Sequence, residues 1–428
     1  MAPLAVDDAP PAETAAGSDP DGDIATALGE LGAALLDAGY AVTDVAQTLR
    51  TVGKVRGRTD LTIGVLPSAI MVDDPVACRM RLVNSTGAAL TFDQVAEVAT
   101  IARSAELAPL SDTTLRDRIG AIRTRRPRFP RAVAVLGSGL QSAGIAVVFR
   151  TTWWAVALDF VLALLVGAAL MIGGRVAGLM AVLPFLLTFA VSLVVYRLAG
   201  DLQLGAVTLF AVCAPLVILI PGATITTGVV ELTAGDVVSG GGRFVSGLIM
   251  WATLAVGIAA GAAVVGVPAT SQELATPVPG WAMVPAVVVL GVGVGLFFDA
   301  SWSLMGVLVG VLLITFGVVT AAQQVAAGPV ASGIAAAVML PALRLLEVFR
   351  PRWPAAVTFR PAFWLLVPGS LGLIAISELA TAGGQPDAQG LLGDVVATVL
   401  AISLGVQIGA VVSALIRPRA EDPYPEAS

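Results

Sequence analysis

Two stretches of the chain share a motif: residues 219–232 read LIPGATITTGVVEL, and residues 366–379 read LVPGSLGLIAISEL. Both contain Leu-x-Pro-Gly followed, at the same spacing, by Glu-Leu, and they lie 147 residues apart. A second pair, GIAVVFRTTW at 144–153 and GVGLFFDASW at 293–302, lies 149 residues apart. Because two independent pairs have nearly the same separation, they indicate that the chain contains two copies of one unit.

The composition places most of these two copies in lipid. Of the 428 residues, 57% are hydrophobic and 13% are charged, and the mean hydropathy is +0.90. Soluble domains are about 45–50% apolar and about 25% charged. The chain has no histidine and two cysteines, Cys78 and Cys213, which excludes Ser-His-Asp catalysis and the usual zinc sites. We therefore expect a membrane protein that is not an enzyme and that needs neither a metal nor a cofactor.

Ten apolar segments follow Arg131, most of them near the roughly 20 residues that a helix needs to cross the hydrocarbon. They are 132–149, 151–174, 176–196, 203–230, 243–267, 281–299, 301–320, 326–347, 361–383 and 391–416. Each copy of the repeat then has five crossings. Since five is odd, the second copy must enter the bilayer from the opposite side, which is the inverted repeat of many secondary transporters. The sequence thus predicts a mainly α, polytopic fold with ten transmembrane helices in two inverted five-helix repeats.

The arginines set the expected orientation. With the N-terminus inside, the predicted cytoplasmic loops and tail contain most arginines of the membrane region, as the positive-inside rule requires. These are Arg175, Arg243, Arg344, Arg350, Arg352, Arg360, Arg417 and Arg419. Arg150, on the outside, and Asp299, on the inside, run against the pattern. We expect a multi-pass protein of the inner (plasma) membrane with both termini in the cytoplasm.

The first part of the chain is more polar and predicts a small cytosolic α/β domain at residues 24–122. Residues 1–23 are acidic and rich in proline and alanine, as in a disordered tail. Helices are expected at Ile24–Asp37, from a cap at Thr43 or Asp44 to Lys54, from Thr91 to Glu106, and after a cap at Ser111. Short antiparallel strands are expected at Leu61–Leu66, Ala69–Val72 and Cys78–Val83.

A basic linker, residues 123–131, joins this domain to the membrane region. Its five arginines abut the first apolar segment, which favours attraction to anionic lipid over binding to nucleic acid. Beyond it we expect the first repeat at 132–267, an external linker at 268–280, the second repeat at 281–416 and a cytosolic tail at 417–428.

The Pro-Gly motifs are the candidate substrate site. Proline removes a backbone donor and breaks a helix. The helix that restarts after the break presents free N–H groups to a carboxylate, and freed carbonyls attract an ammonium group. A packing kink without a ligand is the alternative. The candidate substrate-binding residues are Pro221, Gly222, Thr224, Thr226, Pro368, Gly369 and Ser370.

Three carboxylates are candidates for ion coupling. Asp159 lies inside the second segment, where an ionised carboxylate is costly and needs a functional reason or a neighbouring hydroxyl. Its equivalent in the second repeat is Leu308. Glu231 and Glu378 correspond to each other, but both end their segments, and a surface position is the alternative for them.

Several of these stretches together resemble the threonine/serine exporter family. They are LLDAGYAVTDVAQTL at 35–49, LTIGVLPSAIMV at 61–72, LIPGATITTGVVELTAGDVVSGGGR at 219–243 and FWLLVPGSLGL at 363–373. The resemblance implies export of threonine and serine by proton antiport, with the amino acid, protons and the bilayer as partners. Uncoupled flux through a channel or facilitator, export of small dicarboxylates, and assembly into a homo-oligomer remain open alternatives.

Overall fold

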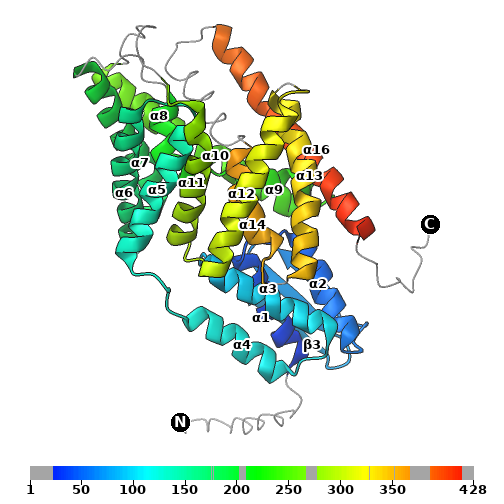
Figure 1. Cartoon of the computed structure of the whole chain (residues 1–428). Helices are drawn as coiled ribbons and strands as arrows, with labels where there is room; N and C mark the ends of the chain where they lie inside the picture. The colour runs from blue at the N-terminus through cyan, green and yellow to red at the C-terminus, as the bar shows by residue number, and fades with distance from the viewer. Residues whose placement is uncertain are drawn as a thin grey trace, which may run out of the picture.

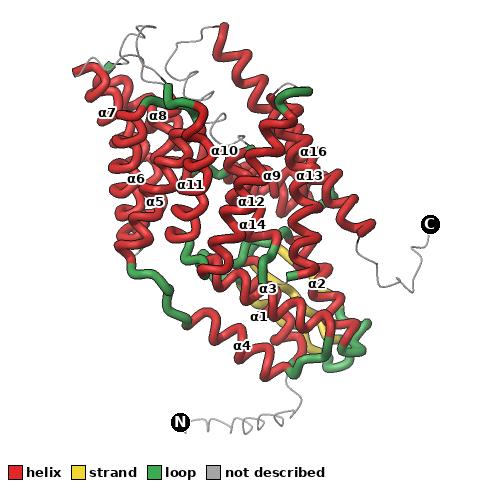
Figure 2. The backbone as a smooth tube through the Cα atoms, in the orientation of Figure 1, coloured by secondary structure: helices red, strands yellow, loops and turns green. Residues whose placement is uncertain are grey.

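The computed structural model describes residues 23–174, 176, 178–201, 209–266, 277–326, 328–350, 352–366 and 386–416. Within these residues, an α/β region lies at one end of a bundle of long helices (Figure 1). Figure 2 shows that the strands gather in this region, whereas the remainder of the described chain is helical.

The α/β region contains the predicted elements in the predicted order. They are α1 (Ile24–Asp37), α2 (Val42–Val55), β1 (Thr62–Leu66), β2 (Ala69–Asp74), β3 (Arg79–Asn84), α3 (Phe92–Leu107) and α4 (Asp112–Thr124). The strands form an antiparallel sheet in the order β1-β2-β3. Helix α1 packs against the sheet through Gly29, where a Cβ would lie 2.5 Å from Cγ2 of Val83. The small residue therefore permits the close helix–sheet contact.

Of the four predicted helix starts, those at Ile24, Thr91 and Ser111 are confirmed and one is wrong. Thr91 forms a capping box with Gln94, and the side chain of Ser111 caps α4. Helix α2, in contrast, begins at Val42, and neither Thr43 nor Asp44 caps it. The free N–H of Val42 donates instead to Oε1 of Glu231 in the helical bundle, 3.0 Å away. A tertiary contact thus takes the place of the local cap.

Seven of the ten predicted segments are present, among the described residues, as helices long and apolar enough to cross a membrane. They are α5 (Arg131–Val148), α6 (Trp153–Gly173), α7 (Leu179–Asp201), α10 (Val237–Val265), α11 (Met283–Phe297, preceded by the 3-10 helix η2, Gly280–Ala282), α12 (Trp302–Ala322) and α13 (Gly328–Phe349). The chain is thus a mainly helical, multi-pass membrane protein.

The fourth predicted segment, 203–230, is broken as expected. Its described part consists of α8 (Leu209–Cys213), the 3-10 helix η1 (Ala214–Leu219) and α9 (Gly222–Thr233). Ile220 has an extended backbone, and the backbone of Pro221 also lies outside the helical region. A residue before proline is driven out of the helical conformation, and proline itself has no N–H to continue the helix. The predicted break at Pro221-Gly222 is therefore confirmed.

The last two predicted segments are described in part. Helix α14 (Ala355–Leu365) begins before the predicted start at residue 361, and residues 367–385 lie outside the described chain. Helix α16 (Pro386–Ile416) covers the predicted segment 391–416. Helix α14 ends shortly before Pro368, as α8 and η1 end before Pro221.

Helices α5 and α11 pack against each other in opposite directions. A Cβ on Gly144, near the end of α5, would lie 2.7 Å from the carbonyl oxygen of Ala286, near the start of α11. A Cβ on Gly293 would lie 2.7 Å from the carbonyl oxygen of Gly137. Gly144 and Gly293 are separated by 149 positions, and so are Gly137 and Ala286. The contact is therefore reciprocal, as between two units related by a two-fold axis.

A second contact is also repeated between the halves. Gly257 of α10 packs on Phe185 of α7, and Gly405 of α16 packs on Gly333 of α13. Both partners in the second contact lie 148 positions after those in the first. Small residues allow such close approach of helices in membranes. The two halves therefore use the same helix pairs in the same register.

Two glycine pairs with four-residue spacing, Gly257/Gly261 and Gly306/Gly310, differ in their surroundings. Gly257 and Gly261 do lie in a close helix contact, but a Cβ on Gly306 or Gly310 would meet no described atom within 4 Å. The pair that corresponds to Gly257 and Gly261 is instead Gly405 and Gly409. Spacing alone cannot distinguish a glycine pair at a helix interface from one on an open surface.

Candidate functional site

The restart of the fourth helix lies well away from the contact between the bundle and the α/β region. Helix α9 begins at Gly222, and Glu231 lies near its other end, beside the α/β region. At 1.5 Å per residue, the nine residues between them span about 14 Å, roughly half of the ~30 Å hydrocarbon core. Gly222 is buried and Thr224 is exposed. The backbone N–H groups at this helix start suit a carboxylate ligand.

The break also joins the two halves of the bundle. Before it, η1 packs on α5 and α6 of the first half. After it, α9 packs on α10 and also on α14 and α16 of the second half. Figure 1 shows α9 in the middle of the bundle between these helices. The broken segment therefore lies at the boundary between the two halves.

A group of buried polar side chains lies on α5 and α6. Asp159 is 0% exposed, and Gln141 and Ser142 are each 1% exposed. Among the described residues, no hydrogen-bond partner exists for either carboxylate oxygen of Asp159, for the amide group of Gln141 or for the hydroxyl group of Ser142. An ionised carboxylate at the centre of a span costs about 2.5–3.5 kcal/mol on insertion scales. Groups of this kind are candidates for a functional site.

Glu231 lies in an ion pair at the contact with the α/β region. Its side chain is 0% exposed, and Oε2 lies 3.1 Å from Nε of Arg243 on α10. Its Oε1 accepts the N–H of Val42, and Nη2 of Arg243 donates to the carbonyl oxygen of Tyr40 at 3.4 Å. The surface position considered from sequence is thus not observed for Glu231, and its partners favour a role in holding the α/β region.

The loop between α1 and α2 carries the main part of this contact. Gly39 has φ of +86°, and a Cβ there would lie 2.5 Å from Nη2 of Arg360 on α14. Tyr40 lies near Arg344 and Glu347 of α13, and removal from water raises the pKa of its phenol above the ordinary value. Gly39 and Tyr40 belong to the stretch LLDAGYAVTDVAQTL, for which the structure thus shows a role in contacting the helical bundle.

Three further contacts fix the α/β region to the second half. Asp44 of α2 pairs with Arg344, with Oδ2 and Nη2 2.9 Å apart. The N–H of Phe92 donates to the carbonyl oxygen of Phe298 at 2.8 Å, and the two rings stack at 4.7 Å. The guanidinium group of Arg360 lies 6.0 Å from the ring centre of Phe92. The α/β region therefore bridges both halves of the bundle.

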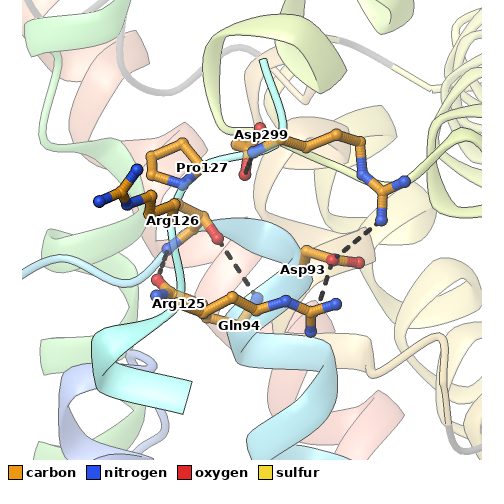
Figure 3. A pocket seen from close by; sticks show the side chains of 8 residues that line it. Asp93, Gln94, Arg125, Arg126, Pro127 and Asp299 are labelled. Atoms are coloured by element: carbon orange, nitrogen blue, oxygen red, sulfur yellow. Dashed lines mark hydrogen bonds and ion pairs between the residues drawn. The ribbon is translucent and has the colours of Figure 1, made fainter. Parts of the chain in front are cut away.

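Asp299 holds the linker at the same end of the bundle. Its carboxylate accepts the backbone N–H groups of Arg128 and Phe129 at 3.0 and 2.9 Å. Beside it lies a cavity of about 190 Å³ (Figure 3), where Asp93 lies 3.3 Å from Arg128 and 3.9 Å from Arg125. These contacts explain an acidic side chain at a turn where the arginine pattern predicts positive charge.

Arg150 and Asp299 occupy equivalent turns at opposite ends of the bundle. They have φ of 56° and 57°, uncommon for residues other than glycine, and lie 149 positions apart. Exposed tryptophans follow them, Trp153 and Trp302, at the starts of α6 and α12. Tryptophan is enriched at membrane–water interfaces.

Several predicted site residues receive no structural test. Pro368, Gly369, Ser370 and Glu378 lie outside the described residues. Thr226 lies within α9, but its side chain is not described. In the described part, the structure brings the helix break close to α5 and α6, which bear Gln141, Ser142 and Asp159. The sequence signal for Gln141 and Ser142 was their polarity within an otherwise apolar segment.

Comparison with known families gives one match. The ThrE family model, described as "Putative threonine/serine exporter", matches residues 26–265. No curated protein and no solved structure matches the chain. The matched residues run from α1 to α10 and include the α1–α2 loop, Asp159 and the helix break. Because the match covers more than half of the chain, the protein belongs to the threonine/serine exporter family.

Proposed function

We propose that the protein is a secondary active exporter of small amino acids, threonine and serine, which works by alternating access and proton antiport. Its place is the inner (plasma) membrane, with both termini in the cytoplasm. Family membership supports export, and the arrangement of the two halves supports the mechanism.

The reciprocal contact between α5 and α11 is the observation that carries this proposal. Each is the first helix of its half, and they run in opposite directions with equivalent residues in contact. Two five-helix units so related form an inverted repeat, in which rocking of one unit against the other exchanges inward- and outward-facing states. The repeated contact of α7 with α10, and of α13 with α16, supports the same relation.

The amino acid is proposed to bind at the break between η1 and α9. The N–H groups at Gly222 and the following residues would bind the carboxylate of the substrate. Carbonyl groups freed before Pro221 would bind the ammonium group. The second motif, at Pro368, Gly369 and Ser370, is proposed as the counterpart from the other half.

The arginine distribution supports the proposed orientation. Arg243, Arg344 and Arg360 all lie where the α/β region contacts the bundle. The positive-inside rule assigns that end, and with it the α/β region, to the cytoplasm.

Uptake of radiolabelled threonine into inside-out vesicles tests the function. Acidifying the vesicle lumen is expected to drive threonine above its equilibrium level, and a protonophore is expected to abolish this accumulation. A pH step of one unit is worth about 1.36 kcal/mol per proton. It therefore supports at most about tenfold accumulation for one exchanged proton, provided that the membrane potential is clamped.

Two results would contradict the proposal. Threonine flux that never exceeds equilibrium would indicate an uncoupled channel or facilitator. Accumulation of a small dicarboxylate, with threonine and serine excluded, would assign a different substrate class. Empty vesicles and vesicles with the protein but without a pH step are the controls.

A further inference from the structure

We infer that Asp159, Ser142 and Gln141 form the binding site of the coupled proton, which exists once per chain and is separate from the amino-acid site at the helix break. This inference rests on the proposed function and locates its coupling step. It adds Gln141 and Ser142 to the site and states how many protons the chain carries in each cycle.

The three side chains combine deep burial with a lack of partners. Each is at most 1% exposed, and none has a hydrogen-bond partner among the described residues. Buried polar side chains in proteins are nearly always hydrogen-bonded. Three exceptions on two neighbouring helices therefore indicate groups whose partner is exchanged during the transport cycle.

Helix packing places Ser142 opposite Asp159. One turn before Ser142, the hydroxyl of Ser138 donates to the carbonyl oxygen of Ala163 on α6, 2.8 Å away. Helices α5 and α6 run in opposite directions, so one turn forward on α5 corresponds to one turn back on α6. That step leads from Ser138 to Ser142 and from Ala163 to Asp159. The hydroxyl and the carboxylate thus lie at the same level of one interface.

The surroundings of Asp159 supply no fixed positive charge. The titratable group in electrostatic reach of Asp159, among the described residues, is the thiol of Cys213, which is itself near the phenol of Tyr196. Helix α5 contributes the uncharged Ser142 at the level of Asp159, and the residue before it, Gln141, is uncharged as well. No arginine or lysine of the described chain pairs with Asp159. Binding of a proton is therefore what neutralises this carboxylate during the transport cycle.

The second half has no equivalent site. The positions 149 residues after Gln141, Ser142 and Asp159 are occupied by apolar or side-chain-free residues: Leu290, Gly291 and Leu308. The helix break, in contrast, has a Pro-Gly counterpart in the second half. The proposed proton site therefore has no counterpart in the second half, whereas the helix motif has one.

The proton site and the helix break belong to different elements. Asp159 and Ser142 lie on α6 and α5, whereas the break lies at Ile220 and Pro221, between η1 and α9. Helix η1 packs on both α5 and α6, so it connects the two places.

The test uses the full-length chain in proteoliposomes with two assays, threonine exchange at equal pH on both sides and accumulation driven by a pH step. Wild-type exchange is expected to depend on pH, and accumulation to reach no more than about tenfold per pH unit, the limit for one proton. D159N is expected to lose accumulation, and its residual exchange to become independent of pH. D159E, which keeps the carboxylate, is expected to restore pH dependence with a shifted midpoint.

S142A and Q141L are expected to shift the pH midpoint of exchange by about one unit, because each removes a buried polar group and thereby changes the desolvation of the ionised carboxylate. S138A is the matched control. The hydroxyl of Ser138 is also buried on α5, but it donates to the backbone carbonyl oxygens of Val135 and Ala163. The S138A variant is expected to have the same pH midpoint of exchange as the wild type.

Three results would overturn the inference while leaving the exporter proposal intact. They are wild-type accumulation by D159N, an unshifted midpoint in both S142A and Q141L, and accumulation above the one-proton limit. Accumulation driven by a sodium gradient at constant pH, or absence of threonine exchange in the wild type, would instead refute the proposed function itself. Fluorescence size-exclusion profiles confirm that each variant is folded.

Discussion

Replacing Glu231 with alanine is expected to release the α/β region from the helical bundle. The change leaves the guanidinium group of Arg243, 21% exposed, without its carboxylate partner, and it leaves the N–H of Val42 without an acceptor. Removing one partner of a buried ion pair costs about 3–5 kcal/mol. Each 1.4 kcal/mol is tenfold in the docking equilibrium, so opening should increase about a hundredfold or more.

Hydrogen exchange of the α1–α2 loop in the full-length chain measures this effect. The E231A variant should exchange the peptide that covers residues 38–45 faster by the same factor, because exchange reports local opening. D44A is the matched control: its ion pair with Arg344 joins the same two regions, but the side chains are 38% and 30% exposed. Exposed pairs contribute about 0–1 kcal/mol. Equal protection in E231A and D44A would contradict the account.

Valine at Gly144 or at Gly293 is expected to separate α5 from α11 and to destabilise the membrane region. In both variants the new side chain meets a backbone carbonyl oxygen of the opposite helix, at Ala286 or at Gly137. Overpacking usually costs about 1–3 kcal/mol, and a clash with backbone belongs at the upper end. Because the two contacts are equivalent, the two substitutions should have similar effects.

Thermal unfolding of the purified protein in detergent checks this prediction. Valine at Gly306 or Gly310 is the control, since a Cβ at either position meets no described atom within 4 Å. Surface substitutions usually change stability by at most about 0.5 kcal/mol. If G144V and G293V unfolded at the same temperature as G306V, α5 and α11 would not form the described contact.

Local patterns predicted much of the fold. The helix at Ile24–Asp37, the caps at Thr91 and Ser111 and the order of the three strands all follow from neighbouring residues in the chain. The break at Pro221 follows from the covalent structure of proline itself. Such features do not depend on distant contacts, and the structure contains them where the sequence places them.

The errors and omissions arise from contacts between distant residues. Val42 needs no local cap because Glu231, on the other side of the interface, accepts its N–H. Asp299 departs from the arginine pattern because it binds the linker. The correspondence of Gly405 and Gly409 with Gly257 and Gly261 is evident only from the helix packing. None of these partners lies close in sequence, so periodicity and propensity contain no signal for them.

The sequence predicted single residues of the candidate site but not how they lie relative to one another. The cost of burying a carboxylate identified Asp159 from sequence. Gln141 and Ser142 were visible as polar residues in an apolar segment, but their position relative to Asp159 requires the packing of α5 on α6. Glu231 matched Glu378 in the repeat, yet its ion pair with Arg243 became evident only in three dimensions.

The claim that the two halves cross the membrane in opposite directions is tested most directly at the equivalent turns after α5 and α11. A membrane-impermeant maleimide is applied to R150C and S301C, with the exposed Cys78 of the α/β region as an internal marker. In right-side-out vesicles, only the R150C thiol should react, and in inside-out vesicles, S301C and Cys78 should react together. Reaction of R150C and S301C from the same side would contradict the inverted arrangement.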